Sequence, residues 1–243
     1  MASTRPVLQL LRPPNLFTVP GDPLCGALLA SHGAWNWRIL PAMAASLCAY
    51  CAGLIINDLA DFREDVRERP SRPLPSASVS LRLAIWLAVL FLAAALGAAF
   101  CANRIVAIVA GLLLVNILWY NLKAKRNAAI APVAMGLCRG LSVLVGAVAI
   151  APFDPSAANS IWRGPAFIPA CVILVYIAAV TAMARGETRD PRRPALIGAL
   201  IRALLFIQAG FCVWAGGIGW GAALVLLALW PISRMVSSHF YAS

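Results

Sequence analysis

Long apolar runs separated by short charged segments make up this chain. Runs of about 20 apolar residues match the thickness of a bilayer when they fold as α-helices. The pattern therefore predicts an all-α fold, a multi-pass transmembrane bundle of about eight helices forming one domain over residues 1–243. Pro20 and Pro23 predict a kink in the first run, and only a few glycines separate the last two. The predicted spans are residues 16–31, 39–57, 81–101, 104–121, 130–151, 165–184, 195–215 and 217–235.

Composition supports an integral membrane protein. The chain is 62% hydrophobic and 12% charged, and a water-soluble domain carries about twice that fraction of charged residues. In a soluble protein the net charge of +11 would suggest nucleic-acid binding. Here the charges lie between apolar runs, so we expect no nucleic acid. The expected partners are anionic membrane lipid and a polyanionic substrate.

The distribution of basic residues predicts how the bundle is oriented. Sixteen of the 20 Lys and Arg residues fall on the side that holds the two chain ends and the loops 58–80, 121–129 and 185–194. Three fall on the other side, and Arg139 lies within a predicted helix. Because cytoplasmic loops carry an excess of basic residues, the first side is predicted to be cytoplasmic.

The main candidate for chemistry is the acidic segment that follows the second predicted span. Five of the nine acidic residues lie within residues 58–68, and Asn57 precedes them. If the helix continues through this segment, Asp58, Asp61 and Asp65 fall within about 60° of one another on one face. Such like charges repel, and a hard divalent cation such as Mg²⁺ removes the repulsion. The segment suggests a metal site for a phosphate-bearing substrate, with a solvated helix end as the alternative.

Two basic clusters are candidates for binding phosphate. A proline-rich loop presents Arg69 and Arg72 next to the acidic segment, and guanidinium groups match phosphate oxygens in pairs. The alternative is that these arginines bind only lipid headgroups. The second cluster, residues 120–126, contains the only lysines, Lys123 and Lys125. It is either a cytoplasmic anchor or a group that neutralises a leaving diphosphate.

Three further charged residues have two interpretations each. Arg139, near the cytoplasmic end of its helix, either extends toward the lipid headgroups or lines a cavity and holds an anionic group. Glu187 and Asp190 lie three residues apart, so they would face the same way on a helix. They form either a second metal-binding pair or an ordinary charged loop.

The motif Asn57-Asp58-x-x-Asp61-x-x-x-Asp65, followed by Arg69-Pro-x-Arg72-Pro-Leu-Pro-Ser76, resembles the first aspartate-rich signature of the UbiA superfamily of intramembrane prenyltransferases. Residues 120–126 resemble the next loop of that family, and Arg12-Pro-x-Asn15 is similar to its first helix. The segment RPPNLFTVPGDP is similar to the start of the EboC-like branch, which is encoded in bacterial gene clusters. The resemblance covers about residues 10–190.

This resemblance implies a helical bundle around a central lipid-open cavity in a bacterial inner membrane, with the active site facing the cytoplasm. It implies a transferase that uses Mg²⁺ to move a prenyl group from a prenyl diphosphate to a small aromatic or hydroxylated acceptor. By position, Asp58, Asp61 and Asp65 would be catalytic. The implied metal ligands are Asn57, Asp58, Asp61, Asp65, Glu187 and Asp190. The implied substrate-binding residues are Asn15, Arg69, Arg72, Lys123, Arg126 and Arg139.

The chain departs from the family pattern in two respects. Glu187 and Asp190 stand where the family usually has two or more aspartates, and eight spans are predicted where nine are common. Two other classes remain open. A CDP-alcohol phosphatidyltransferase also uses membrane aspartates and Mg²⁺, but its Asp-Gly…Ala-Arg signature does not occur here. The other class is a non-catalytic membrane scaffold or transporter; transporters place their charges near the middle of the membrane, whereas the acidic segment here is predicted at the cytoplasmic surface.

Overall fold

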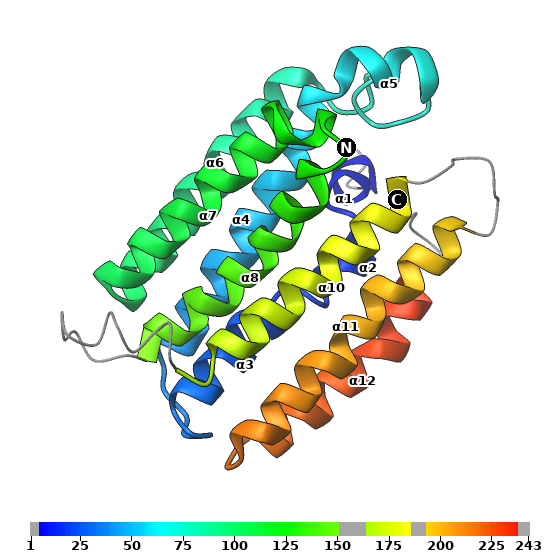
Figure 1. Cartoon of the computed structure of the whole chain (residues 1–243). Helices are drawn as coiled ribbons and strands as arrows, with labels where there is room; N and C mark the ends of the chain where they lie inside the picture. Colours follow the sequence, from blue (N-terminus) through cyan, green and yellow to red (C-terminus); the bar gives the residue numbers. More distant parts are fainter. Residues whose placement is uncertain (1–4, 151–163, 186–192, 238–243) are drawn as a thin grey trace.

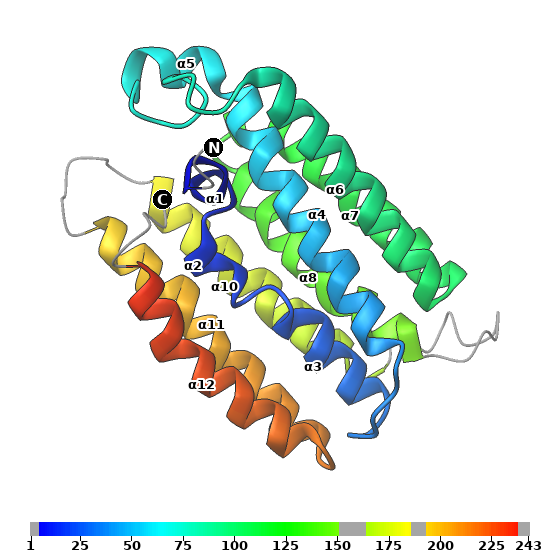
Figure 2. The same ribbon diagram turned by 180° about the vertical axis from the view of Figure 1, so that it is seen from behind.

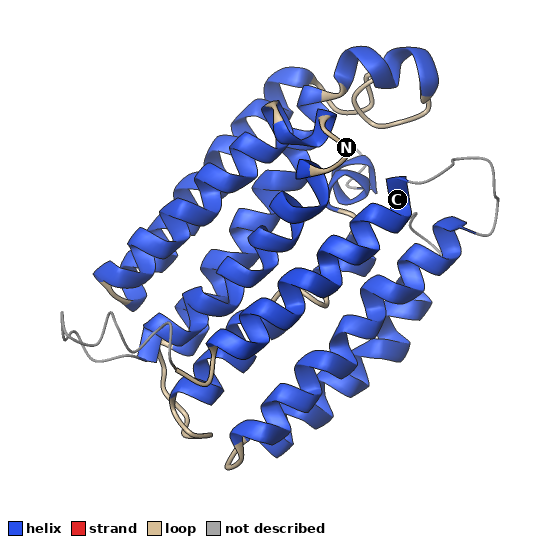
Figure 3. Ribbon diagram, in the orientation of Figure 1, coloured by secondary structure: helices blue, strands red, loops and turns tan. Residues whose placement is uncertain are grey.

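The computed structural model describes residues 5–150, 164–185 and 193–237, and the regular elements in these ranges are all helical (Figures 1 and 3). Seven of the described helices are long and apolar enough to cross a bilayer. They confirm the predicted all-α, multi-pass membrane fold. These spans are α4 (Ile39–Ala60), α6 (Leu81–Ala102), α7 (Arg104–Leu122), α8 (Ile130–Ile150), α10 (Phe167–Arg185), α11 (Arg193–Ala215) and α12 (Gly219–Ser237).

The first predicted span is interrupted, as its prolines suggested. Of the predicted residues 16–31, only α3 (Gly21–Ala30) is a helix of more than one turn, and it is preceded by two short helices, α1 (Arg5–Leu11) and α2 (Pro13–Leu16). Arg12 joins the two short helices with a φ of 45°, a left-handed conformation that ends α1 before Pro13. At ten residues, α3 is too short to cross a bilayer alone. The chain therefore has an interrupted first segment and seven full spans in the part that the structure describes.

The helices form a bundle with α6 and α7 on one flank and α11 and α12 on the opposite flank, while α3, α4, α8 and α10 lie between them (Figures 1 and 2). Small residues bring the central helices close together. A side chain on Gly26 of α3 would overlap the carbonyl oxygen of Val143 in α8, and one on Gly146 would overlap that of Pro23. The backbones of α3 and α8 therefore touch, which holds the short α3 in place inside the bundle.

Alanines line the contact between α4 and α6. Ala42 of α4 and Ala95 and Ala99 of α6 are fully buried in one apolar cluster with residues of α7 and α8. A face of alanines lets two helices approach closely in a membrane, where packing rather than water exclusion drives association. This contact fixes α4, the helix that carries the start of the acidic segment.

The glycines between the last two predicted spans form a true turn. Gly216 and Gly217 have φ values of 73° and 52°, a left-handed conformation that glycine adopts without strain. The turn is pinned to the loop after α3, because the N–H of Ile218 donates to the carbonyl oxygen of Gly33 at 3.0 Å. The structure therefore confirms that α11 and α12 are separate helices.

Candidate active site

The acidic segment bends where the apolar run ends. Helix α4 stops at Ala60, Asp61 occupies the junction, and the short helix α5 (Phe62–Glu68) lies across one end of the bundle (Figure 1). Because α5 carries mostly charged, exposed residues, it follows the membrane surface rather than extending α4. The condition for one shared helical face is therefore not met. Within the described ranges, no three acidic, His or Cys side chains cluster as one metal site.

Asp58 and Asp65 nevertheless converge on one guanidinium group. Both are almost completely buried, and Arg72 Nη1 donates to the two carboxylate oxygens of Asp65 at 2.8 and 3.1 Å. The same Nη1 lies 3.9 Å from Asp58 Oδ1. Arg12 Nη2 donates to that Asp58 oxygen at 2.9 Å. Arg69 is more exposed and reaches Asp65 only at 3.9 Å, so Arg72 is the arginine of this loop that binds the acidic segment.

Asp61 faces a different cation. It forms an ion pair with Lys125, whose Nζ also lies 3.4 Å from Asn57 Oδ1. Lys125 belongs to the 3-10 turn η1 (Ala124–Arg126), and Arg185 of α10 donates to its carbonyl oxygen at 2.8 Å. This contact ties the turn to the end of α10 and holds the ammonium group at the acidic segment.

In the 120–126 cluster, Lys125 forms the ion pair with Asp61, whereas the predicted substrate ligands are Lys123 and Arg126. Lys123 and Arg126 are exposed, whereas Lys125 is half-buried. Lys125 lies in the 3-10 turn η1, and its ammonium group is the one that pairs with Asp61. Lys123 and Arg126 therefore remain predicted substrate ligands, and Lys125 joins the site on direct geometric grounds.

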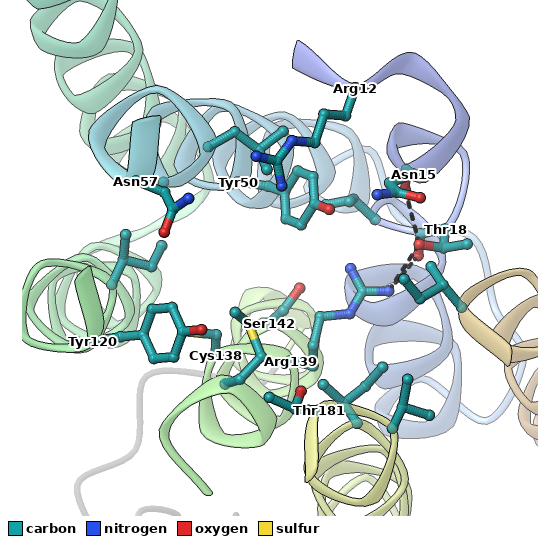
Figure 4. Close-up of a pocket in the computed structure, with 18 of the residues that line it drawn as sticks. Arg12, Asn15, Thr18, Tyr50, Asn57, Tyr120, Cys138, Arg139, Ser142 and Thr181 are labelled. Atoms are coloured by element: carbon teal, nitrogen blue, oxygen red, sulfur yellow. Dashed lines mark hydrogen bonds between the residues drawn. The ribbon is translucent and has the colours of Figure 1, made fainter. Parts of the chain in front are cut away.

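A cavity of about 350 Å³ lies among the central helices next to this cluster. Its walls are mainly apolar, with Leu113, Ile117 and Leu204 among them. Arg12 and Asn57 line the cavity, and Arg12 also donates to Asp58 while Asn57 lies 3.4 Å from Lys125 Nζ, so the charged cluster adjoins the cavity through these two residues. Figure 4 shows polar side chains from several helices directed toward this space. They are Arg12, Asn15, Thr18, Tyr50, Asn57, Tyr120, Cys138, Arg139, Ser142 and Thr181.

Arg139 lines the cavity, which decides between its two predicted positions. Its Nε lies 2.9 Å from Asp22 Oδ2, and its Nη2 donates to the carbonyl oxygen of Thr18 at 2.9 Å (Figure 4). Gln208 of α11 donates to Asp22 Oδ1 at 2.6 Å and to the Thr18 carbonyl oxygen at 2.8 Å. Asp22 and Gln208 are fully buried. This network joins α3, α8 and α11 at the cavity wall, and it already gives Arg139 an anionic partner.

Two of the remaining predicted residues lie outside the described ranges, and two lie at the site. Glu187 and Asp190 fall within residues 186–192, so their roles stay predictions. Asn15 is buried in α2 and lines the cavity, where a substrate ligand is expected. Arg72 is held against Asp65, in the charged cluster that adjoins the cavity.

The sequence analysis did not identify Asp22, Tyr50 or Gln208, and it named Lys125 only as a member of the 120–126 cluster. A signal for Asp22 was present, since it is an acid inside one apolar run and Arg139 is a base inside another. Ionisable residues within membrane spans usually pair with one another. Tyr50 and Gln208 had no such signal, because near-uniform apolar runs do not reveal which helix face points inward.

The oxygen donors at the acidic segment fit a divalent cation. Asn57 and Asp61 converge on one ammonium group, and Asp58 and Asp65 converge on one guanidinium group. Each pair thus already surrounds a positive charge with oxygen atoms. Carboxylate and amide oxygens are the ligands that hard divalent cations take, with waters and phosphates completing the shell.

Fold and site together define a class: a multi-pass membrane protein with a mainly apolar cavity that adjoins a cluster of paired acidic and basic side chains. The sequence profile of the UbiA prenyltransferase family matches residues 23–241, and the chain belongs to this family. Prenyltransferases of the family are membrane-embedded enzymes that transfer a prenyl group from a prenyl diphosphate to an acceptor. They generally use divalent metal ions. The resemblance noted from the aspartate motif is thereby confirmed.

Similar proteins agree with this assignment. Digeranylgeranylglyceryl phosphate synthase of Thermococcus kodakarensis is 26% identical over 250 residues, which cover 94% of this chain and 83% of that protein. The bacteriochlorophyll synthase 34 kDa chain of Chloroflexus aurantiacus is 31% identical over 153 residues, or 60% and 52% of the two chains. A solved UbiA homologue from Aeropyrum pernix K1 superposes with a TM-score of 0.62 at 22% identity, covering 91% of this chain and 88% of that one. At that identity the likeness supports the fold.

Proposed function

We propose that this protein catalyses the Mg²⁺-dependent transfer of a prenyl group from a polyprenyl diphosphate to a small aromatic or hydroxylated acceptor. The observation that carries the proposal is the position of Arg12. It lines the mainly apolar cavity and also donates to Asp58 at 2.9 Å, which supports one site made of the cavity and the charged cluster. A molecule with an apolar tail and a polyanionic head matches such a site in both of its parts.

The prenyl tail would occupy the cavity, whose apolar walls offer it packing contacts in place of those it makes with lipid. The diphosphate would lie at the charged cluster, within reach of Arg12, Arg72 and Lys125. Guanidinium and ammonium groups donate charge-assisted hydrogen bonds to phosphate oxygens. The exposed Arg69, Lys123 and Arg126 would extend this positive region and attract the headgroup.

The predicted metal ligands are Asn57, Asp58, Asp61 and Asp65, together with Glu187 and Asp190. When bound, Mg²⁺ supplies positive charge that offsets the charge developing on the leaving diphosphate. The pairing of each acid with a cation supports this assignment, since these oxygens already lie around positive charges.

The reaction begins with heterolysis of the bond between the allylic carbon and the bridging oxygen. Diphosphate leaves with the electron pair, and N–H donors of Arg12 and Arg72 stabilise its oxygens. The acceptor then donates an electron pair to the allylic cation and releases a proton. Meanwhile the apolar walls exclude water that would otherwise capture the cation. The rings of Tyr50 and Tyr120, which line the cavity, are suited to stabilise the cation through their π-faces.

The distribution of basic residues indicates on which side of the membrane the active site lies. The acidic segment, η1 and the end of α10 lie at the end of the bundle that carries most basic residues, which favours a cytoplasmic active site. The similarity of the N-terminal segment to the EboC-like branch favours a bacterial inner membrane. Both statements are part of the proposal.

The test is the release of diphosphate from farnesyl or geranylgeranyl diphosphate in the presence of Mg²⁺. Asp58→Ala and Asp61→Ala should each reduce the rate by at least about 100-fold, the usual effect of losing a transition-state contact. Glu64→Ala is the matched control, because Glu64 is an exposed acid of the same segment. It should keep a rate close to that of the wild type. Unchanged turnover in both aspartate variants, with the fold intact, would refute the proposal.

A further inference from the structure

A second hollow lies on the outer flank of the bundle, away from the active site. It is a groove of about 410 Å³ between α11 and α12. It shares no lining residue with the active-site cavity. Helices α11 and α12 lie at the edge of the bundle (Figures 1 and 2), and Phe206 of the groove is 50% exposed, so the groove is accessible from the surrounding bilayer. Its lining residues are Ala199, Arg202, Ala203, Phe206, Trp230 and Arg234.

The two arginines of this groove place two like charges side by side. Arg202 projects from α11 and Arg234 from the last turn of α12. The guanidinium of Arg202 extends back along its helix, since a Cβ on Gly198 would lie 3.4 Å from Nη1. This direction leads toward the end of the bundle that carries the acidic segment, and arginines near helix ends extend in this way to the headgroup region.

The described part of the chain provides no acid for these charges. Its acidic residues lie in α3, in α4, at the junction after it and in α5, on other parts of the bundle. Two guanidinium groups that face one groove repel each other and are costly to bury near a membrane unless an anion joins them. The groove is therefore complementary to a negatively charged group.

Aromatic side chains line the groove beside the charges. The rings of Phe206 and Trp230 meet edge to face, with centroids 5.9 Å apart. The Arg234 guanidinium carbon lies 5.9 Å from the centre of the Trp230 ring. Phe206 is 50% exposed, although it is a large apolar residue. An occupant that fits this groove thus has an anionic end and an apolar end.

We propose that the groove binds an anionic phospholipid from the leaflet on the active-site side of the membrane. The lipid phosphate would lie between Arg202 and Arg234, whose donors match phosphate oxygens in pairs. One acyl chain would follow Phe206 and Trp230. A free phosphate ion would pair with the arginines but would leave the apolar wall of the groove uncovered. Because α11 and α12 both span the bilayer, a lipid can reach both parts of the groove.

The experiment is a titration of the purified full-length protein with phosphatidylglycerol, with bound lipid counted by native mass spectrometry. The doubly substituted variant Arg202→Gln, Arg234→Gln should bind about 30-fold more weakly, since each basic residue near a membrane surface contributes about 1 kcal/mol. Arg234→Gln alone, at an exposed position, should weaken binding about fivefold. Arg202→Lys with Arg234→Lys keeps the charge but loses the paired donors, so its affinity should lie between those of the wild type and the double Gln variant.

The control is Arg82→Gln, an exposed arginine at the start of α6 on the opposite flank, which should keep the wild-type affinity. Phosphatidylcholine should bind weakly to all variants. Equal affinity of the wild type and the double variant for phosphatidylglycerol would overturn the proposal. So would an equal loss in Arg82→Gln, or displacement by inorganic phosphate at matched concentration. A dimer that disappears in the double variant would assign the groove to a second copy of the chain instead.

Discussion

Breaking the buried ion pair between Arg139 and Asp22 should strongly destabilise the bundle. Asp22 is fully buried, and its Oδ2 lies 2.9 Å from Arg139 Nε. Removing one partner of a buried pair leaves an uncompensated charge, at a cost of about 3–5 kcal/mol. Arg139→Met and Asp22→Asn should each lose stability in this range. Arginine stays protonated, so Asp22→Asn leaves the charge of Arg139 buried without a partner and without a way to become neutral.

The double variant provides the sharper test. Removing both charges leaves no isolated ion, so Asp22→Asn with Arg139→Met should lose clearly less stability than the sum of the two single losses. The assay is reversible unfolding in mixed micelles with increasing SDS, followed by circular dichroism. Arg104→Met, at an exposed position, should stay within about 0.5 kcal/mol of the wild type.

Two results would refute this reasoning. One is a loss below about 1 kcal/mol in both single variants, which would mean that the pair is solvated or relaxed in the membrane protein. The other is strict additivity in the double variant, because residues in one network couple.

Two further predictions concern the site and the packing. Lys125→Gln should raise KM for the prenyl diphosphate about tenfold, because it removes a charged contact at the acidic segment. Lys123→Gln should change KM less. Equal effects of the two substitutions on KM in steady-state assays would contradict the geometry. Gly146→Ala should lower the free energy of unfolding by about 1–3 kcal/mol, because its methyl group would overlap the Pro23 backbone. Gly97→Ala, which adds a methyl group in open space, should be neutral or stabilising. Denaturation curves that show no difference between these two variants would contradict the close α3–α8 contact.

Much of the fold follows from the sequence, because helix length and apolar composition are local properties. The runs locate the seven spans within a few residues, and Pro20 and Pro23 indicate the interruption of the first segment. The glycines at 216 and 217 have the positive φ that a tight turn requires. Each of these features depends on a few neighbouring residues.

The details of the site depend on contacts between distant segments. The bend at Asp61 arises because α5 settles at the membrane surface, which local helix propensity does not reveal. Lys125 rather than Lys123 reaches the acids because a 3-10 turn, anchored by Arg185, sets the direction of the side chain. The pairing of Asp22 with Arg139 joins residues that are more than a hundred positions apart. The sequence indicated the chemistry of the site more clearly than the partner of each charge.

The central claim is that the acidic segment and the cavity form one site for a metal ion and a prenyl diphosphate. The most direct test is thermal stabilisation of the purified protein by Mg²⁺ with farnesyl or geranylgeranyl diphosphate, compared with a CDP-lipid and with no ligand. At 100 times Kd the diphosphate should add about 2.7 kcal/mol, or about 5–10 °C in Tm. Asp58→Ala should lose most of this shift. No shift in the wild type, or an equal shift with the CDP-lipid, would contradict the claim.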